Sequence, residues 1–120
     1  MSVRRLEKIN THGVEWTSLL KDLLQKLNSA GPICKVYIFG SFAAGTMSQA
    51  SDLDIAVILP NNSNPEEFKR KLPRPLCSWP LDLLIVNNAR FEERKNFGGV
   101  LMEVFHHGVE LYPNWVWRNE

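Results

Sequence analysis

The fold is decided by residues 39–59, which read FGSFAAGTMSQASDLDIAVIL. An apolar, β-branched run from Ile33 to Phe39 leads into this stretch and predicts a buried strand. Gly40 and Ser41 break the run with a turn, before a short helical segment. A second apolar run, Leu53 to Leu59, predicts the next strand. The stretch is therefore expected to form a strand, a Gly-Ser turn, a short helix, a loop and a second strand that opens on carboxylates.

The carboxylates and the turn have a spacing that suits phosphate and metal chemistry. Side chains alternate along a strand, so Asp52 and Asp54 project from one face with Cα atoms about 6.6 Å apart. Both could reach one divalent ion or a close pair. Gly40 has no Cβ, so a triphosphate can approach its backbone, and Ser41 supplies a hydroxyl. The alternative is a structural Gly-Ser turn followed by a solvated Ser-Asp loop.

The motif resembles a known signature. Gly40-Ser41, ten intervening residues and Asp52-Leu53-Asp54 are similar to the signature of the DNA polymerase β-like nucleotidyltransferase superfamily. The short chain most resembles its minimal nucleotidyltransferase (MNT) branch, and the order of elements matches until about residue 112. The resemblance implies an α/β fold, with a small mixed sheet of about four strands and helices packed on it.

A third carboxylate lies further along the chain. Asp82 belongs to the run Leu81–Val86, which predicts a third strand, and a carboxylate there is costly unless it is paired or metal-bound. If this strand lies beside the one that carries Asp52 and Asp54, the three carboxylates form a set. The superfamily resemblance assigns its third acidic residue this place. The alternative is a strand end near solvent, because Pro80 precedes Asp82.

The remaining elements are read from apolar spacing and turn residues. Leucines at helical spacing predict an amphipathic helix with one buried face over His12–Ser29, with Thr11 as its N-cap. Further helices are expected over Pro65–Leu72, with Asn64 as its cap, and over Ala89–Lys95. Another is expected over Phe97–His106, with an apolar face made of Phe97, Leu101, Val104 and Phe105, and with Gly108 as a left-handed stop. Val109–Tyr112 is expected to form a final strand.

Length and composition bound the class of protein. A chain of 120 residues that is 44% hydrophobic indicates one globular domain, residues 1–120. Cys34 and Cys77 are far apart without a CxxC pattern, so reduced core thiols in a cytoplasmic protein are expected rather than a disulfide. Met1 to Asn10 lacks the apolar region of a signal peptide, and no run approaches the about 18 apolar residues of a membrane span.

Charge is balanced overall but locally uneven. Fourteen basic and thirteen acidic residues give a net charge of +1, which argues against nucleic acid as the main partner. The basic residues gather at one place: Lys69, Arg70, Lys71 and Arg74. This cluster is either a phosphate or nucleic-acid contact or a solvated helix end. The second reading is favoured because Glu66 and Glu67 offset the charge.

The resemblance implies a reaction and a role for each site residue. A hydroxyl would attack the α-phosphorus of ATP or another nucleoside triphosphate, and pyrophosphate would leave. Asp52 and Asp54 would ligate two Mg²⁺ ions, since oxygen ligands favour Mg²⁺. Asp82 would ligate the metal nearest the acceptor and could take its proton. Gly40 and Ser41 would hold the β- and γ-phosphates.

The resemblance also implies a protein partner. Larger superfamily members add domains that hold the acceptor, so here the acceptor surface is expected from a second copy or another protein. MNT proteins commonly pair with a small helical HEPN-domain protein. In toxin–antitoxin pairs of this kind the MNT member is the antitoxin. It can transfer AMP to a tyrosine on the toxin. The aromatic tail Trp115–Trp117 either closes the core or forms a partner surface. Two rival functions are an inert binding module and a transferase for a small-molecule hydroxyl.

Overall fold

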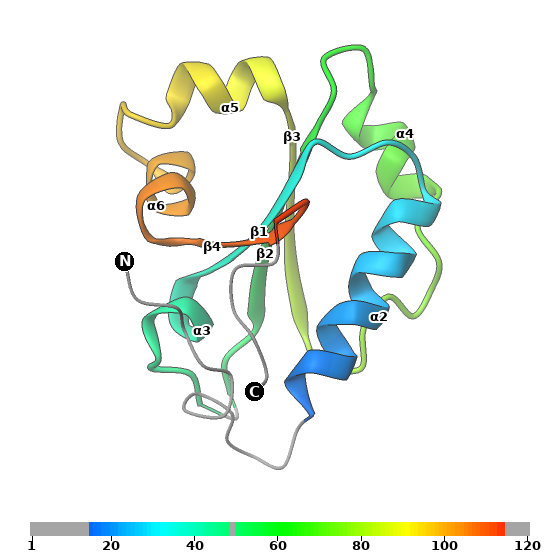
Figure 1. Cartoon of the computed structure of the whole chain (residues 1–120), viewed down its shortest axis with the longest axis vertical. Coiled ribbons are helices and arrows are strands. Elements are labelled where there is room, and N and C mark those ends of the chain that lie inside the picture. The colour runs from blue at the N-terminus through cyan, green and yellow to red at the C-terminus, as the bar shows by residue number, and fades with distance from the viewer. Residues whose placement is uncertain (1–14, 49, 115–120) are drawn as a thin grey trace.

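The computed structural model describes residues 15–48 and 50–114. In chain order the elements are α2 (Trp16–Ser29), β1 (Lys35–Phe39), α3 (Gly40–Ala44), β2 (Leu53–Leu59), α4 (Pro65–Arg70), β3 (Leu81–Asn87), α5 (Asn88–Arg94), α6 (Val100–His107) and β4 (Val109–Tyr112) (Figure 1). The four-stranded sheet has the order β3-β2-β1-β4. Strands β2 and β3 are parallel, whereas β1 pairs antiparallel with both β2 and β4. The predicted α/β fold with a mixed sheet is confirmed.

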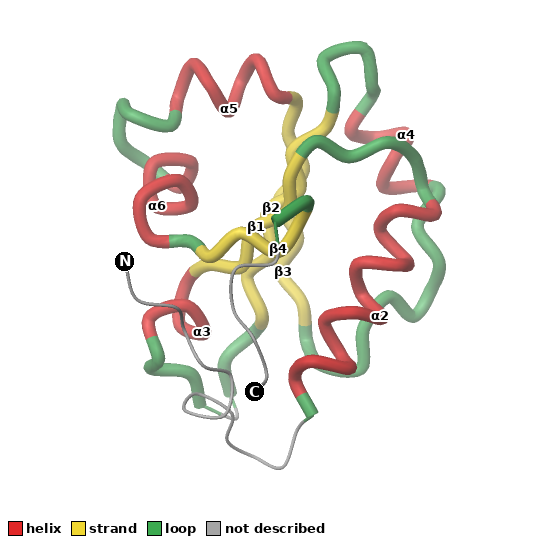
Figure 2. The backbone as a smooth tube through the Cα atoms, in the orientation of Figure 1, coloured by secondary structure: helices red, strands yellow, loops and turns green. Residues whose placement is uncertain are grey.

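Helices cover both faces of the sheet. Figure 2 shows the strands between α2 and α4 on one side and α5 and α6 on the other. Residues of β2 alternate between the two faces: Ile55 and Val57 pack with the leucines of α2, while Ala56 and Ile58 pack with Phe91 of α5. Because β2 is buried on both faces, its sequence from Ile55 to Leu59 is continuously apolar rather than alternating.

Helix α2 fits its predicted amphipathic pattern. Trp16, Leu20, Leu23 and Leu27 are at most 1% exposed and form its buried face. The helix is confirmed from Trp16 onward; the expected cap Thr11 lies outside the described residues, as does the tail Trp115–Trp117. The indole of Trp16 also packs edge-on against Phe42, with ring centroids 5.0 Å apart, which connects α2 to α3.

Several predicted boundaries need correction. Helix α6 begins at Val100 rather than Phe97, because Gly98 and Gly99 both have positive φ and interrupt the helix. Phe97 is consequently 77% exposed and Phe105 37% exposed, so neither belongs to the buried face of α6. That face is made by Leu101 and Val104.

The structure also tests the predicted helix cap, the first strand, the cysteines and the membrane prediction. The Asn64 side chain caps α4 by accepting hydrogen bonds from the backbone N–H groups of Glu66 and Glu67. Strand β1 starts at Lys35 rather than Ile33. The thiols Cys34 and Cys77 are free and partly exposed rather than fully buried in the core. None of the helices in the described ranges has the length and apolarity needed to cross a bilayer.

Gly108 does not form the predicted left-handed stop. Its φ of −76° and ψ of 163° are extended, so the prediction of a left-handed glycine is wrong. Glycine is required here for space instead: a Cβ would collide with the carbonyl oxygen of Val104 and lie 3.3 Å from that of Ile38. This close approach lets β4 leave α6 directly and pair with β1.

We expect Gly108→Ala to lower the free energy of unfolding by about 1–3 kcal/mol, the usual cost of forcing extra atoms into a packed site. Urea unfolding followed by circular dichroism measures this loss. His107→Ala, at the exposed neighbouring position, serves as control and should change stability by less than about 0.5 kcal/mol. Equal stability of the Gly108→Ala protein and the wild type would contradict the proposed steric role.

Candidate active site

The register of two parallel strands brings two of the predicted carboxylates together. Asp54 of β2 is the direct Cα partner of Asp82 in β3, and on its other side Asp54 lies opposite Phe39, the last residue of β1. Adjacent strands lie about 4.8 Å apart, and directly opposed side chains point to the same face. Asp54 is therefore at the centre of the site, with the β1–α3 junction on one flank and Asp82 on the other.

The carboxylates open into a cavity on the α5 and α6 side of the sheet. Even-numbered residues of β2, such as Ala56, pack on that side, so Asp54 faces it too. The cavity has a volume of about 370 Å³ and is lined by Phe39, Gly40, Asp54, Asp82, Leu83, Leu84, Val100 and Glu103. We call this space the carboxylate cavity. Its size suits part of a small ligand.

The structure gives a reason for glycine at position 40 that differs from the one expected from the sequence. It is the first residue of α3, and its φ of +72° is in the left-handed region that favours glycine. The space that a Cβ would need is already filled by the Asp54 carboxylate. Gly40 therefore lets the backbone and Asp54 pack together. Whether a phosphate also approaches this backbone remains a prediction.

The electrostatics of the cavity disfavour a further negative charge. Burial raises the pKa of Asp54 above its ordinary value, and the negative charges of Asp82, Glu103 and Asp52 raise it further. Like charges that close to one another are relieved by a bound cation, and carboxylate oxygens are the ligands that Mg²⁺ prefers. The donor chemistry at Asp54 and Asp82 thus fits a magnesium ion.

Asp52 and Ser41 lie at the margin of the site. Asp52 is exposed and precedes β2; neither it nor the partly exposed Ser41 lines the carboxylate cavity. Two hydrogen bonds fix the backbone on either side of Asp52: the Trp79 indole N–H donates to the Ser51 carbonyl at 2.8 Å, and the Leu53 N–H donates to the Pro80 carbonyl at 2.8 Å. These bonds tie the start of β2 to the approach to β3.

The metal set remains a prediction. Within residues 15–48 and 50–114, no three His, Cys, Asp or Glu side chains stand close enough together to form a metal site. The structure brings Asp54 and Asp82 together on one face, with Asp52 two residues before Asp54. Asp82 is exposed near the start of β3, and it is also the direct partner of Asp54. Its position therefore agrees with both interpretations of the sequence, a strand end near solvent and a neighbour of the other carboxylates.

Glu103 is the site residue that sequence reasoning missed. It lies on α6, more than twenty residues after Asp82, and no motif spacing connects it to the other carboxylates. A lone glutamate on a helix is usually a surface charge. Only the packing of α6 beside the sheet turns Glu103 toward Asp54, where its charge contributes to the raised pKa.

We expect Glu103→Gln to lower the pKa of Asp54, because it removes a negative neighbour and keeps the shape of the side chain. A carbon-13 NMR titration of the Asp54 carboxyl group measures the shift. Glu66→Gln, on α4 across the sheet, is the matched control and should leave that pKa unchanged. An Asp54 pKa that does not respond to Glu103→Gln would contradict the described cavity.

Comparisons with known proteins identify the family and support the fold. The family model described as "Polymerase beta, Nucleotidyltransferase" matches residues 20–113, well over half of the chain. Among solved structures, a candidate nucleotidyltransferase from Sulfolobus solfataricus has the same fold, with a TM-score of 0.54 and 21% sequence identity. The match covers 73% of this chain and 78% of that one. No curated protein matches. The chain therefore belongs to the polymerase beta nucleotidyltransferase family.

Proposed function

We propose that this chain transfers a nucleoside monophosphate, AMP from ATP, to a hydroxyl group on a partner protein. Family membership supports nucleotidyl transfer as the reaction class. The observation that carries the proposal is the direct pairing of Asp54 with Asp82 at a cavity that also reaches Gly40. Two carboxylates in that arrangement can hold cations beside a triphosphate and still leave one oxygen near an incoming hydroxyl.

The reaction forms one phosphorus–oxygen bond and breaks another. The acceptor oxygen attacks the α-phosphorus of ATP, the bond from that phosphorus to the bridging oxygen breaks, and pyrophosphate carries away the electron pair. Bound Mg²⁺ would neutralise the charge that develops on the phosphate oxygens. The hydroxyl proton passes to a carboxylate oxygen of the site.

Each predicted residue has a separate task in this proposal. Asp52 and Asp54 hold the cations at the triphosphate, and Asp54 has the negative charges of Asp82, Glu103 and Asp52 around it. Asp82, which is exposed on the edge strand β3, serves the acceptor side in this proposal and takes the proton. The Ser41 hydroxyl, next to Gly40, donates to the β- or γ-phosphate.

Exposed apolar side chains at the cavity and shortly before α6 support a protein as acceptor. Val100, which lines the carboxylate cavity, is 47% exposed, and Phe97, three residues earlier in the chain, is 77% exposed. Aromatic and apolar groups of this kind are enriched in the cores of protein interfaces. A HEPN-type toxin fits as the partner of an MNT protein, and this chain would then act as its antitoxin.

We expect Gly40→Ala to weaken ATP binding strongly, because alanine must adopt a positive φ and its Cβ displaces the Asp54 carboxylate. Backbone strain alone costs about 1 kcal/mol, and loss of the Asp54 position adds to it. Ser41→Ala should have a milder effect, because only one donor is lost. Calorimetric titration with ATP and Mg²⁺ gives both affinities. If Gly40→Ala binds ATP as the wild type does while remaining folded, the site assignment is wrong.

We expect Asp54→Asn and Asp82→Asn to abolish transfer by different routes. Asp54→Asn should lose nucleotide affinity, whereas Asp82→Asn should retain much of it and lose turnover, since it serves the acceptor. A cost of several kcal/mol corresponds to at least about a hundredfold loss in rate. Intact mass spectrometry of the co-expressed HEPN-type partner measures the AMP adduct.

The matched control is Asp22→Asn, an aspartate on the exposed side of α2 that should leave transfer unchanged. An adduct formed by wild type and control but not by the site variants supports the proposal. A stable complex without an adduct under any nucleotide would favour the inert binding module instead. Absence of any complex, together with transfer to a small alcohol, would favour the small-molecule transferase.

A further inference from the structure

A second and larger cavity lies on the opposite face of the sheet from Asp54. It has a volume of about 630 Å³ and is lined by Lys69, Leu72, Pro73, Arg74, Pro75, Leu76, Cys77, Ser78, Trp79, Pro80, Leu81 and Leu83. We call it the basic groove. Leu81 and Leu83 pack on the α2 side of β3, whereas Asp82 between them faces the other way. The basic groove therefore opens on the opposite face from the carboxylate cavity, and Leu83 is the one lining residue that the two share.

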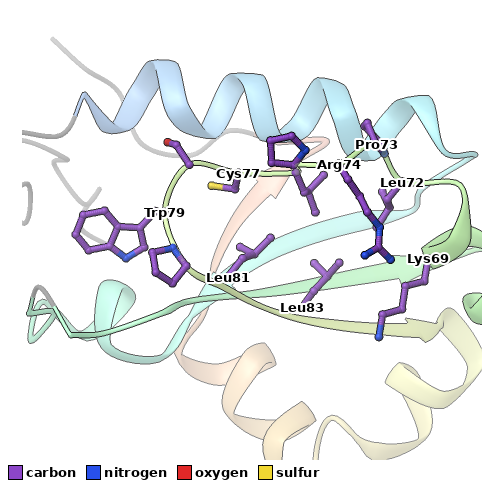
Figure 3. Close-up of a pocket in the computed structure, with 12 residues that line it drawn as sticks. Lys69, Leu72, Pro73, Arg74, Cys77, Trp79, Leu81 and Leu83 are labelled. Carbon is purple, nitrogen blue, oxygen red and sulfur yellow. The ribbon is translucent and has the colours of Figure 1, made fainter.

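The basic groove is chemically different at its two ends. Figure 3 shows Lys69 and Arg74 reaching into the end near Leu83, while Cys77 and Trp79 lie at the other end. In the described part of the chain neither Lys69 nor Arg74 takes part in an ion pair; the two that occur there are Lys26–Asp22 and Lys95–Glu92. A ligand with a negative end and an apolar body would match both ends.

The wall of the groove is held in place before any ligand arrives. Lys26 of α2 donates to the Pro75 carbonyl at 3.3 Å, and the Trp79 indole N–H donates to the Ser51 carbonyl at 2.8 Å. Prolines also restrict the backbone of this loop, as at Pro73. A preformed wall reduces the entropy lost on binding.

The position of the groove favours an extended chain as its ligand. Its floor contains Leu81 and Leu83 of β3, an edge strand whose outer side has no strand partner among the described residues. The two leucines are one strand repeat apart, about 6.6 Å, which matches alternate side chains of a peptide lying beside them. Lys69 and Arg74 are the two basic residues that line the groove, whereas Glu66 and Glu67, which offset charge on α4, are not among its lining residues.

We propose that the basic groove binds an extended segment of a partner protein in which acidic residues adjoin alternating apolar residues. The carboxylates lie at Lys69 and Arg74, and the apolar side chains lie over Leu81 and Leu83. Burial raises the pKa of the Cys77 thiol, so the far wall stays uncharged and suits an apolar side chain. This binding is independent of nucleotidyl transfer and requires neither ATP nor the carboxylate cavity.

The test uses the whole chain and a fluorescent peptide with consecutive aspartates followed by alternating leucine and serine. Fluorescence anisotropy compares it with the same peptide carrying asparagine in place of aspartate. We expect the acidic peptide to bind the wild type at least about tenfold more tightly, and high salt to reduce the difference. We also expect Lys69→Glu combined with Arg74→Glu to weaken binding of the acidic peptide by about tenfold or more, because attraction becomes repulsion.

Arg90→Glu combined with Arg94→Glu is the matched control, since it makes the same charge change at exposed sites on α5, across the sheet. This control should bind the acidic peptide nearly as the wild type does. Nitrogen-15 NMR locates the peptide independently: supporting shifts are confined to residues 69–83, including the Trp79 indole. Shifts at α5 or α6 instead, equal binding of both peptides, no binding below about 1 mM, or an equal loss of binding in the α5 control variant would each overturn the proposal.

Discussion

The parallel pairing of β2 with β3 is the constraint on which the site depends. Because Asp54 and Asp82 are direct partners, both carboxylates face the same side of the sheet. A slip of one residue would turn Asp82 toward α2 and leave Leu83 beside Asp54. The site has an energetic cost. Burial of Asp54 raises its pKa, and the negative charge of Asp82 raises it further, so the folded state holds the Asp54 proton more tightly. Stability therefore falls as the pH rises from the ordinary pKa through the raised one. Such a cost is common at functional sites.

The layers on either side of the sheet explain why that cost can be sustained. Strand β2 is buried on both faces, so its position is fixed by the core rather than by the carboxylates. Helices α5 and α6 leave the end of the strand uncovered, and α6 places Glu103 and Val100 beside the opening. Phe97 stays exposed before the start of α6, because Gly98 and Gly99 have positive φ and interrupt the helix. Rigid packing and an accessible, negatively charged site therefore occur on the same strand.

The connection from β2 to β3 has two consequences. It must cross one face of the sheet to make the strands parallel, and α4 and the loop over residues 71–80 do so on the α2 side. That path creates the basic groove and also sets the start of β3 at Leu81, two residues after Trp79. The Trp79–Ser51 hydrogen bond joins the groove wall to the segment that carries Asp52. The two sites share a backbone framework although they open on opposite faces.

The sequence by itself determined the order of elements, the α/β class and the candidate residues Gly40, Ser41, Asp52, Asp54 and Asp82, because strand alternation and the Gly-Ser to Asp-x-Asp spacing are local properties. The conformation of glycines was less predictable, as Gly108 shows, since local residue type does not reveal how closely another backbone approaches. Glu103 and the basic groove were decided only by the tertiary structure. Both arise where segments distant in sequence pack together, and no spacing along the chain records that contact.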